Sequence, residues 1–223
     1  MSFYERLVAE TLEEKKVLFS VPVILDAAKG DINRKSYVLY LEQAYHHVKH
    51  TVPLMMHTGS KLSASQEWIR DALIEYVNEE KGHQEWILND IANAGGDAEK
   101  SRYSQPNHAT EMMVAYAYDY ISRVNPLGFF GMVFVLEGTS TQLATGMAET
   151  LMSALSLPKK AFSYLLSHGS LDLEHIEFFK NLVNRIESEE DKQAIIHMAK
   201  RMFILFAEVF RSIPHKNEVK NAT

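Results

Sequence analysis

Apolar residues recur at alternating spacings of three and four over almost the whole chain, which is the period of an α-helix. Glycine, proline and asparagine interrupt the pattern at intervals, where helices are expected to begin and end. No segment alternates apolar and polar residues in the way that is typical of a half-buried β-strand. The sequence therefore predicts an all-α protein.

The interruptions divide the chain into a bundle of seven to eight helices. These helices are expected at residues 4–19, 32–59 with a kink at Pro53, 65–94, 109–124, 128–155, 158–168, 171–186 and 189–210. A polar loop is expected over residues 97–107, and Gly169 and Ser170 interrupt the pattern between the sixth and seventh helices. A length of 223 residues suits one domain with one core. We therefore expect a single domain over residues 1–223, with a loose tail at 214–223.

The composition argues against several classes of function. A net charge of −6 gives no basic footprint for nucleic acid or an anionic membrane surface. No apolar run is long enough to span a membrane, so no membrane partner is expected. The absence of cysteine excludes disulfides, thiolate metal sites and cysteine nucleophiles. The charged N-terminal segment lacks the apolar core of a signal peptide, and a cytoplasmic location is expected.

Two ionisable residues lie where the third predicted helix should be apolar. Its inward stripe is Ile69, Leu73, Tyr76, Glu80, His83 and Ile87. A buried carboxylate is costly unless it is paired or bound to a metal, and Glu-x-x-His is the half-site of di-iron bundle proteins. Glu79 lies about 100° away from this stripe, so Glu80 is preferred. The alternative is that Glu80 and His83 belong to a solvated, charged face.

The fifth predicted helix carries a single acidic residue, Glu137, in its first half. The residues around it are apolar on nearly every side, which is typical of a buried helix. A carboxylate in this position requires a cationic or hydrogen-bonding partner. A metal ion satisfies that requirement, and the alternative is a pairing with a buried arginine or tyrosine.

A third group of ionisable residues follows Ser167. His168, Asp172 and His175 are spaced by four and three residues, which places them on one face of a helix. Two imidazoles and a carboxylate suit iron, manganese or zinc and argue against calcium. The alternative is an aspartate that caps a helix, with two histidines on the surface.

The three groups together provide six candidate metal ligands, which suits two metal ions with open coordination positions. A structural zinc site would need only four. Candidate walls of a substrate pocket are Tyr40, His47, Tyr76, Phe130 and Phe134. His47 could also hold a metal ligand in orientation through a hydrogen bond. Alternatively, His46, His47 and His50 lie at an interface or on the surface. No catalytic residue beyond the metal ligands is predicted.

The order and spacing of these residues resemble the haem-oxygenase-like di-iron oxidases. This family has a TenA/PqqC-like fold and includes an undecene-forming fatty-acid oxidase and the chlamydial protein associating with death domains. Its pattern is a glutamate/histidine helix, a lone glutamate, and then His-x-x-x-Asp-x-x-His. Glu80, His83 and Glu137 match the first two elements. His168, Asp172 and His175 match the last. Some members place the first carboxylate where this chain has Tyr76, whereas members with Glu-x-x-His fit better. If Glu80 points elsewhere, Glu79 or Glu75 is the substitute.

The resemblance implies two irons per chain, dioxygen as co-substrate and a homodimer. It implies an oxidase or oxygenase that acts on a small amino-acid-like or fatty-acid-like molecule by desaturation, C–C cleavage or N-oxygenation. Whether manganese replaces iron is left open. The alternatives are a TenA-like thiamin-related enzyme, which normally uses a cysteine, a cofactorless enzyme of the same fold, or a non-catalytic metal-binding or interaction protein. A haem oxygenase needs a histidine early in the chain, and the first histidine here is His46.

Overall fold

A computed structural model describes the backbone of residues 1–214, and the side chains of the same residues except 141–145 and 168–175. Within this part of the chain every regular element is a helix, which confirms the all-α prediction. The α-helices are α1 Phe3–Glu10, α2 Leu12–Phe19, α3 Pro22–Ala28, α4 Arg34–Val48, α5 Thr51–Lys61, α6 Glu67–Glu80, α7 His83–Asn93, α8 Ala98–Tyr103, α9 His108–Arg123, α10 Phe129–Leu155, α11 Ser163–Asn184 and α12 Glu189–Arg211. Short 3₁₀ turns cover Ala64–Gln66, Pro126–Gly128 and Lys159–Ala161.

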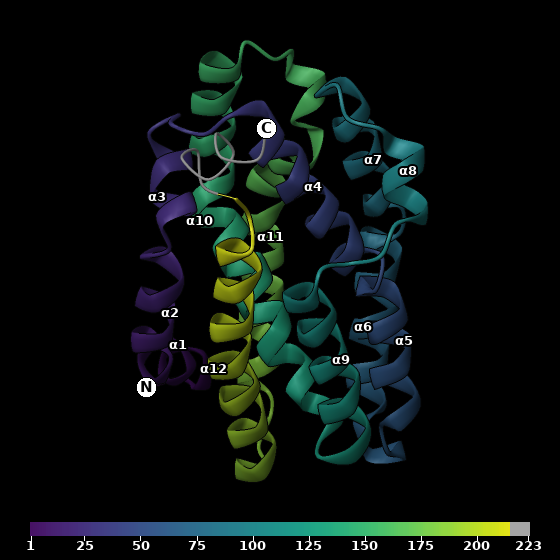
Figure 1. The fold of residues 1–223 in the computed structure, drawn as a ribbon. Helices are drawn as coiled ribbons and strands as arrows, with labels where there is room; N and C mark the ends of the chain where they lie inside the picture. The colour runs from purple at the N-terminus through teal and green to yellow at the C-terminus, as the bar shows by residue number, and fades with distance from the viewer. Residues whose placement is uncertain (215–223) are drawn as a thin grey trace.

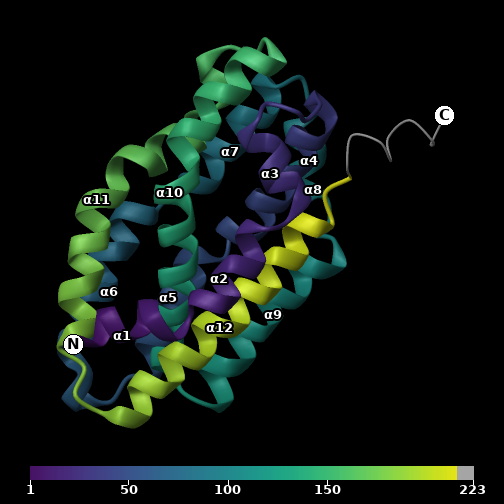
Figure 2. The same ribbon diagram turned by 90° about the vertical axis from the view of Figure 1, so that its left-hand side faces the viewer.

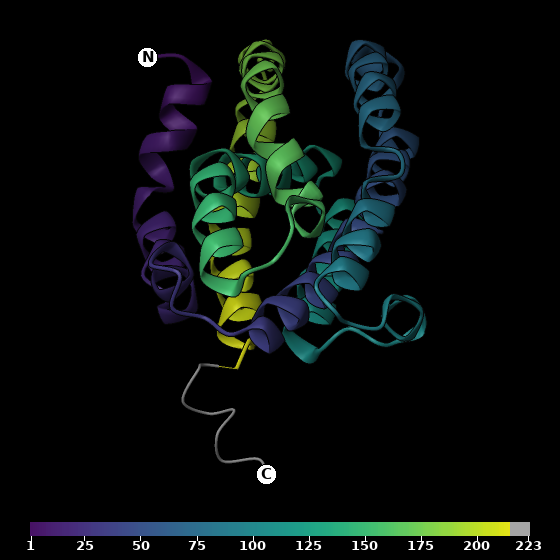
Figure 3. The ribbon, with the colours of Figure 1, turned by 90° about the horizontal axis from the view of Figure 1, so that it is seen from above.

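The three longest helices form the centre of the bundle (Figure 1). α10 packs against both α11 and α12, and α12 also contacts α2 and α9. Seen from above, the N-terminal helices lie on one side of α10–α12, and α5 and α6 lie on the other (Figure 3). In the view from the side, α11 runs beside α10, and α12 runs diagonally across the near face of the molecule next to α9 (Figure 2). α10 is therefore surrounded by neighbours, as its apolar composition predicts.

Three predicted helices are each divided in two. The first breaks at Thr11, whose hydroxyl donates to the carbonyl oxygen of Leu7 at 2.7 Å. The second breaks before Thr51, so Pro53 lies in the first turn of α5, where a missing N–H is tolerated. The third breaks at Gly82, whose φ of +97° strongly favours glycine. The predicted kink at Pro53 was therefore displaced towards the N-terminus by three or four residues.

Two other boundaries differ from the prediction. The break at Gly169 and Ser170 is wrong, because α11 continues through it from Ser163 to Asn184. An interior glycine costs only about 1 kcal/mol, which the packing of α11 against α10 can exceed. The predicted loop over residues 97–107 contains α8, which Asp97 caps by accepting a hydrogen bond from the backbone N–H of Lys100 at 3.0 Å.

α10 and α12 approach each other very closely near Gly131. A Cβ atom at this position would lie 2.7 Å from the backbone nitrogen of Ala199 and closer still to the carbonyl oxygen of Ile195. Only glycine permits this approach of two helix backbones. The contact fixes the separation of the two helices that form much of the cavity wall described below.

Candidate metal and substrate site

Glu80 and His83 lie on either side of the break between α6 and α7. The carboxylate Oε2 of Glu80 is 2.9 Å from Nδ1 of His83, and both side chains are buried, with 9% and 3% exposed. Glu75 and Glu79 are exposed, so Glu80 is the inward-facing carboxylate of this segment. The expected continuous helix was wrong, but the turn at Gly82 keeps both side chains directed inwards.

The imidazole of His83 is held by an aromatic neighbour. The ring of Trp86 stacks on it with a centroid separation of 4.1 Å and an interplanar angle of 27°. Trp86 is half-buried, and it lies one turn further along α7. This stack restricts the rotation of the imidazole, so His83 offers a nitrogen ligand in a defined orientation.

Glu137 lies on α10 and lines the same cavity as Glu80. Tyr76 is fully buried, and the negative charges of both carboxylates act on its hydroxyl. Burial raises the pKa of Tyr76, and the negative charge of Glu137 raises it further, followed by those of the glutamates at 79, 80 and 75. The ring of Tyr76 meets Phe178 of α11 edge-on at 5.0 Å. Glu80, Glu137 and Tyr76 therefore form one acidic, largely buried region.

The remaining three predicted ligands, His168, Asp172 and His175, lie outside the residues whose side chains the structure describes. Among the side chains that are described, no three histidines or carboxylates gather closely enough to hold a metal ion. The six-ligand set therefore stays a prediction, and the described geometry concerns Glu80, His83 and Glu137.

The start of α11 is fixed by a carboxylate from another helix. Asp90 of α7, which is fully buried, accepts hydrogen bonds from the backbone N–H groups of Ser163 and Tyr164, both at 2.9 Å, and from the Ser163 hydroxyl at 2.5 Å. Phe162, at the N-cap position, provides no side-chain bond of its own. Burial raises the pKa of Asp90, and these hydrogen bonds partly offset the shift. Asp90 thus caps α11 from α7.

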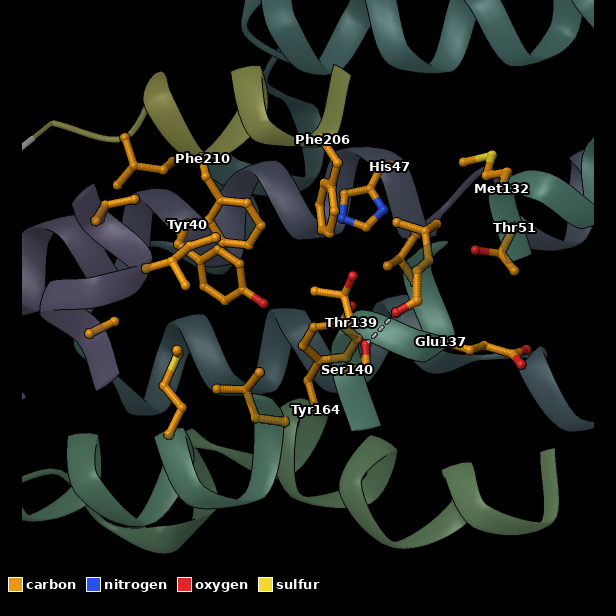
Figure 4. A pocket seen from close by; sticks show the side chains of 18 of the residues that line it. Tyr40, His47, Thr51, Met132, Glu137, Thr139, Ser140, Tyr164, Phe206 and Phe210 are labelled. Atoms are coloured by element: carbon orange, nitrogen blue, oxygen red, sulfur yellow. Dashed lines mark hydrogen bonds between the residues drawn. The ribbon is translucent and has the colours of Figure 1, made fainter. Parts of the chain in front are cut away.

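A cavity of about 120 Å³ extends from this acidic region along α4 and α10. Its wall on α10 reaches from Phe129 to Leu151, so it spans roughly 30 Å at 1.5 Å per residue. In Figure 4, Glu137 lies at one side of the cavity, Tyr40 and Phe210 lie at the other, and His47 lies between them. The cavity is therefore long and narrow, with different chemistry at its two ends.

Most of the cavity wall is apolar, and its hydroxyl groups are largely engaged. Thr139 donates to the carbonyl oxygen of Val135 at 2.6 Å, and Ser140 donates to that of Leu136 at 2.9 Å. The described lining residues include no lysine and no arginine. Glu80 pairs with His83, and Glu137 adds a second carboxylate to the same lining, so this region of the cavity is rich in the ligand types that suit a metal cation.

The residues predicted to contact a substrate fall into two groups. Tyr40 and His47 line the cavity, and His47 is only 4% exposed and meets the ring of Phe206 edge-on at 5.7 Å. Tyr76, Phe130 and Phe134 are not among the lining residues. Phe130 is fully buried against Phe129, and Phe134 packs against Phe179 and Phe203. These two phenylalanines support the core behind the site.

His46 and His50 of the second predicted helix have structural partners. Nε2 of His46 is 2.9 Å from the Ser104 hydroxyl, and Nδ1 is 3.2 Å from Nζ of Lys49. Burial lowers the pKa of His46 to about 4, with smaller contributions from the charges of Lys49 and His50. Nδ1 of His50 is 3.2 Å from the Tyr118 hydroxyl. These contacts favour the structural interpretation of His46 and His50.

The sequence from residue 38 to 207 matches the profile of a family of iron-containing redox enzymes. The chain belongs to this family. No curated protein sequence matches it. A membrane-spanning segment is not found among the helices of the described part of the chain.

Solved structures with the same fold extend the comparison. A domain of unknown function with a haem-oxygenase-like fold from Shewanella denitrificans is 21% identical, covers 100% of this chain and 96% of its own, and has a TM-score of 0.85. A TenA homologue from Pseudomonas syringae has 12% identity, 94% and 91% coverage and a TM-score of 0.77. A haem oxygenase from Leptospira interrogans has 18% identity, 94% and 98% coverage and a TM-score of 0.75. At these identities the likeness establishes the haem-oxygenase-like fold, as predicted.

Proposed function

We propose that this protein is a non-haem di-iron oxidase or oxygenase that oxidises an elongated organic molecule with dioxygen. The observation that carries the proposal is the buried Glu80–His83 pair, because Glu80 lines one apolar cavity together with Glu137. Carboxylates and imidazole are the ligand types that suit iron, and the described lining contains no lysine or arginine that would pair with the carboxylates instead. The proposed ligands are Glu80, His83, Glu137, His168, Asp172 and His175.

The position of α11 supports the assignment of its three ligands. α11 is attached to α7 through Asp90 and Tyr164, and to α6 through the contact between Phe178 and Tyr76. The two attachment points are fourteen residues apart on α11 and fourteen residues apart along α6 and α7. Residues 168–175 lie between the attachment points on α11, and Glu80 and His83 lie between them on the partner. We therefore expect Glu80 and His83 to lie opposite residues 168–175, at the same height along the helix axes.

Each described residue has a defined task in this proposal. Glu80 and Glu137 provide negative charge that balances the metal ions, and Trp86 holds the imidazole of His83 in orientation. Bound iron would supply the redox chemistry by which dioxygen is activated and hydrogen is removed from the substrate. The apolar cavity wall excludes water and holds the substrate along its length.

The cavity favours a fatty-acid-like substrate over an amino-acid-like one. Its long, narrow shape suits an extended aliphatic chain, and its lining is predominantly apolar. No lysine or arginine among the described lining residues is available to hold an anionic group away from the proposed metal ions. The polar end of the substrate is therefore expected beside Glu80 and Glu137, with the chain extending towards Tyr40. Desaturation and C–C cleavage are the outcomes open to a fatty-acid-like substrate, whereas N-oxygenation would require a nitrogen-containing one.

A TenA-like, thiamin-related activity is the second candidate, and the fold of the Pseudomonas syringae homologue favours it. The absence of cysteine removes the nucleophile that such enzymes normally use. A haem-dependent reaction, suggested by the haem oxygenases of the same fold, has no histidine to use before His46. We further propose a cytoplasmic homodimer, which size-exclusion chromatography with light scattering would test.

Metal loading followed by product analysis tests the proposal. Anaerobic titration with ferrous ions should saturate at about two ions per chain, as in two-metal sites. Mixing the loaded protein with dioxygen and fatty acids of increasing length should give new products by mass spectrometry, whereas amino acids and thiamin should not react. Saturation at a single ion, or turnover without iron, would contradict the di-iron assignment.

A further inference from the structure

The end of the cavity opposite the glutamates is built from stacked aromatic rings. Tyr37 stacks on Phe162 with a centroid separation of 4.8 Å, and Tyr40 stacks on Phe210 at 5.7 Å with an interplanar angle of 16°. Tyr40 also lies nearly parallel to Tyr37 at 6.4 Å. The ring of Tyr40 is therefore held between two neighbours, and the direction of its hydroxyl is fixed.

The two tyrosine hydroxyls differ in their partners. The hydroxyl of Tyr37 donates to the carbonyl oxygen of Ala161 at 2.7 Å. The hydroxyl of Tyr40 makes no hydrogen bond to any residue that the structure describes, and it points into the cavity (Figure 4). A molecule in the cavity that offers an acceptor would therefore gain a hydrogen bond from a donor that is already oriented.

The surroundings of Tyr40 define the charge of that acceptor. Burial raises the pKa of Tyr40, and the negative charge of Asp90 raises it further, so the hydroxyl stays protonated and can donate. The same negative charge disfavours an anion at this position. The described lining also contains no lysine or arginine that would compensate an anion. The acceptor that fits beside Tyr40 is therefore uncharged, such as a hydroxyl, ether or carbonyl oxygen.

We propose that Tyr40 determines specificity by donating a hydrogen bond to an uncharged oxygen at the far end of an elongated substrate. The substrate then carries two polar groups, and the second lies at the end near Glu137. The presence of this second group rests on the proposed function. On the continuous helix α10, Glu137 and Met147 both line the cavity, and Met147 packs against the same apolar cluster as Tyr40, so the two groups are about 15 Å apart at 1.5 Å per residue. A fully extended chain of roughly a dozen atoms covers this distance.

Two neutral probes of the same length test the proposal. Dodecanol carries one terminal hydroxyl, and dodecanediol carries one at each end. Binding of both to the metal-free protein is measured by calorimetry, and the quantity compared is the ratio of the two Kd values. In Tyr40→Phe this ratio should shift by about tenfold against the diol, because the variant cannot donate to the second hydroxyl. In Tyr37→Phe, which removes a hydroxyl from the same stack, the ratio should stay at its wild-type value.

The outcomes separate this inference from the metal assignment. An unchanged ratio in Tyr40→Phe, an equal shift in Tyr37→Phe, or a wild-type protein that binds neither probe would overturn the role of Tyr40. If Tyr40→Phe does not fold, the role is supported by a wild-type protein that binds the diol and its monomethyl ether equally well and both more tightly than dodecanol, because the capped end of the ether accepts but cannot donate. A strong preference for the diol over the ether would contradict it. Failure of wild-type iron loading with the Tyr40 effect intact would refute only the di-iron proposal.

Discussion

The two ends of the cavity are built by different means. At the acidic end, Glu80 and His83 meet across a break between two helices, and Glu137, in the middle of a continuous helix, lines the same cavity as Glu80. At the aromatic end, rings from α4 and α12 stack together, and the wall carries hydroxyls in place of charges. Charge is thus confined to one end, and shape and neutral polarity define the other.

Because of this division, we expect metal binding and substrate recognition to depend on different residues. A substitution at the acidic end should change metal binding, whereas a substitution at the aromatic end should change which molecule binds. Asp90 links the two, because it caps α11 and its charge also acts on Tyr37 and Tyr40. Three substitutions test this division, in order of decreasing expected effect.

Removing the carboxylate of Glu137 should have the largest effect. Glu137→Ala is expected to lower iron-dependent turnover by at least a hundredfold, since losing even the outer partners of metal ligands typically costs about 10–100-fold. Diol binding should persist, because the aromatic end is untouched. Glu149→Ala on the exposed side of the same helix is the matched control. Iron titration and turnover are measured for both; equal activity in the two variants would remove Glu137 from the site.

Asp90→Asn should have an intermediate effect that reaches both ends. The amide cannot accept all the hydrogen bonds that Ser163 and Tyr164 donate, so a buried donor loses its partner, which costs about 1–3 kcal/mol. Denaturant unfolding should reveal this loss, and hydrogen exchange should accelerate in the first turn of α11. Asp97→Asn, at the exposed cap of α8, is the comparison. Equal exchange in α11 for both variants would argue against the cap.

His46 should have the smallest effect, and one that depends on pH. Its pKa is lowered from 6.5 to about 4 in the folded protein, so the unfolded chain binds more protons between these values. The stability of the wild type should therefore fall as pH decreases from 6.5 towards 4, and His46→Gln should flatten part of this slope. Thermal unfolding across this range measures it. A change in iron or diol binding in this variant would place His46 in the site, contrary to its contacts with Ser104 and Lys49.

Helical periodicity was sufficient to predict the fold class and the inward direction of Glu80 and His83. It could not predict the break between them, because Gly82 interrupts the helix without disturbing the apolar stripe. The opposite error occurred at Gly169, where a glycine suggests a break but α11 continues. A lone glycine is thus ambiguous in a sequence, since tertiary packing decides whether the helix passes through it.

The capping role of Asp90 was missed, although the sequence contained a signal for it. The stripe that includes Glu80 and His83 continues at position 90, three residues after Ile87, so a third ionisable residue shares that face. Its partners Ser163 and Tyr164 are more than seventy residues away, and periodicity carries no information about such distant pairs. For the same reason, the sequence could not separate Tyr40, which faces the cavity, from Phe134, which faces the core.

A substitution at Gly131 should change the range of substrates, although Gly131 does not line the cavity. The cavity wall is carried partly by α10 and partly by Phe206 and Phe210 of α12, and the separation of these two helices is set where Gly131 meets Ala199. A single methyl group at this position would push the two helices apart, so the cavity would widen while every lining residue stayed the same. Libraries that aim to admit branched or bulkier substrates should therefore sample this crossing point as well as the lining.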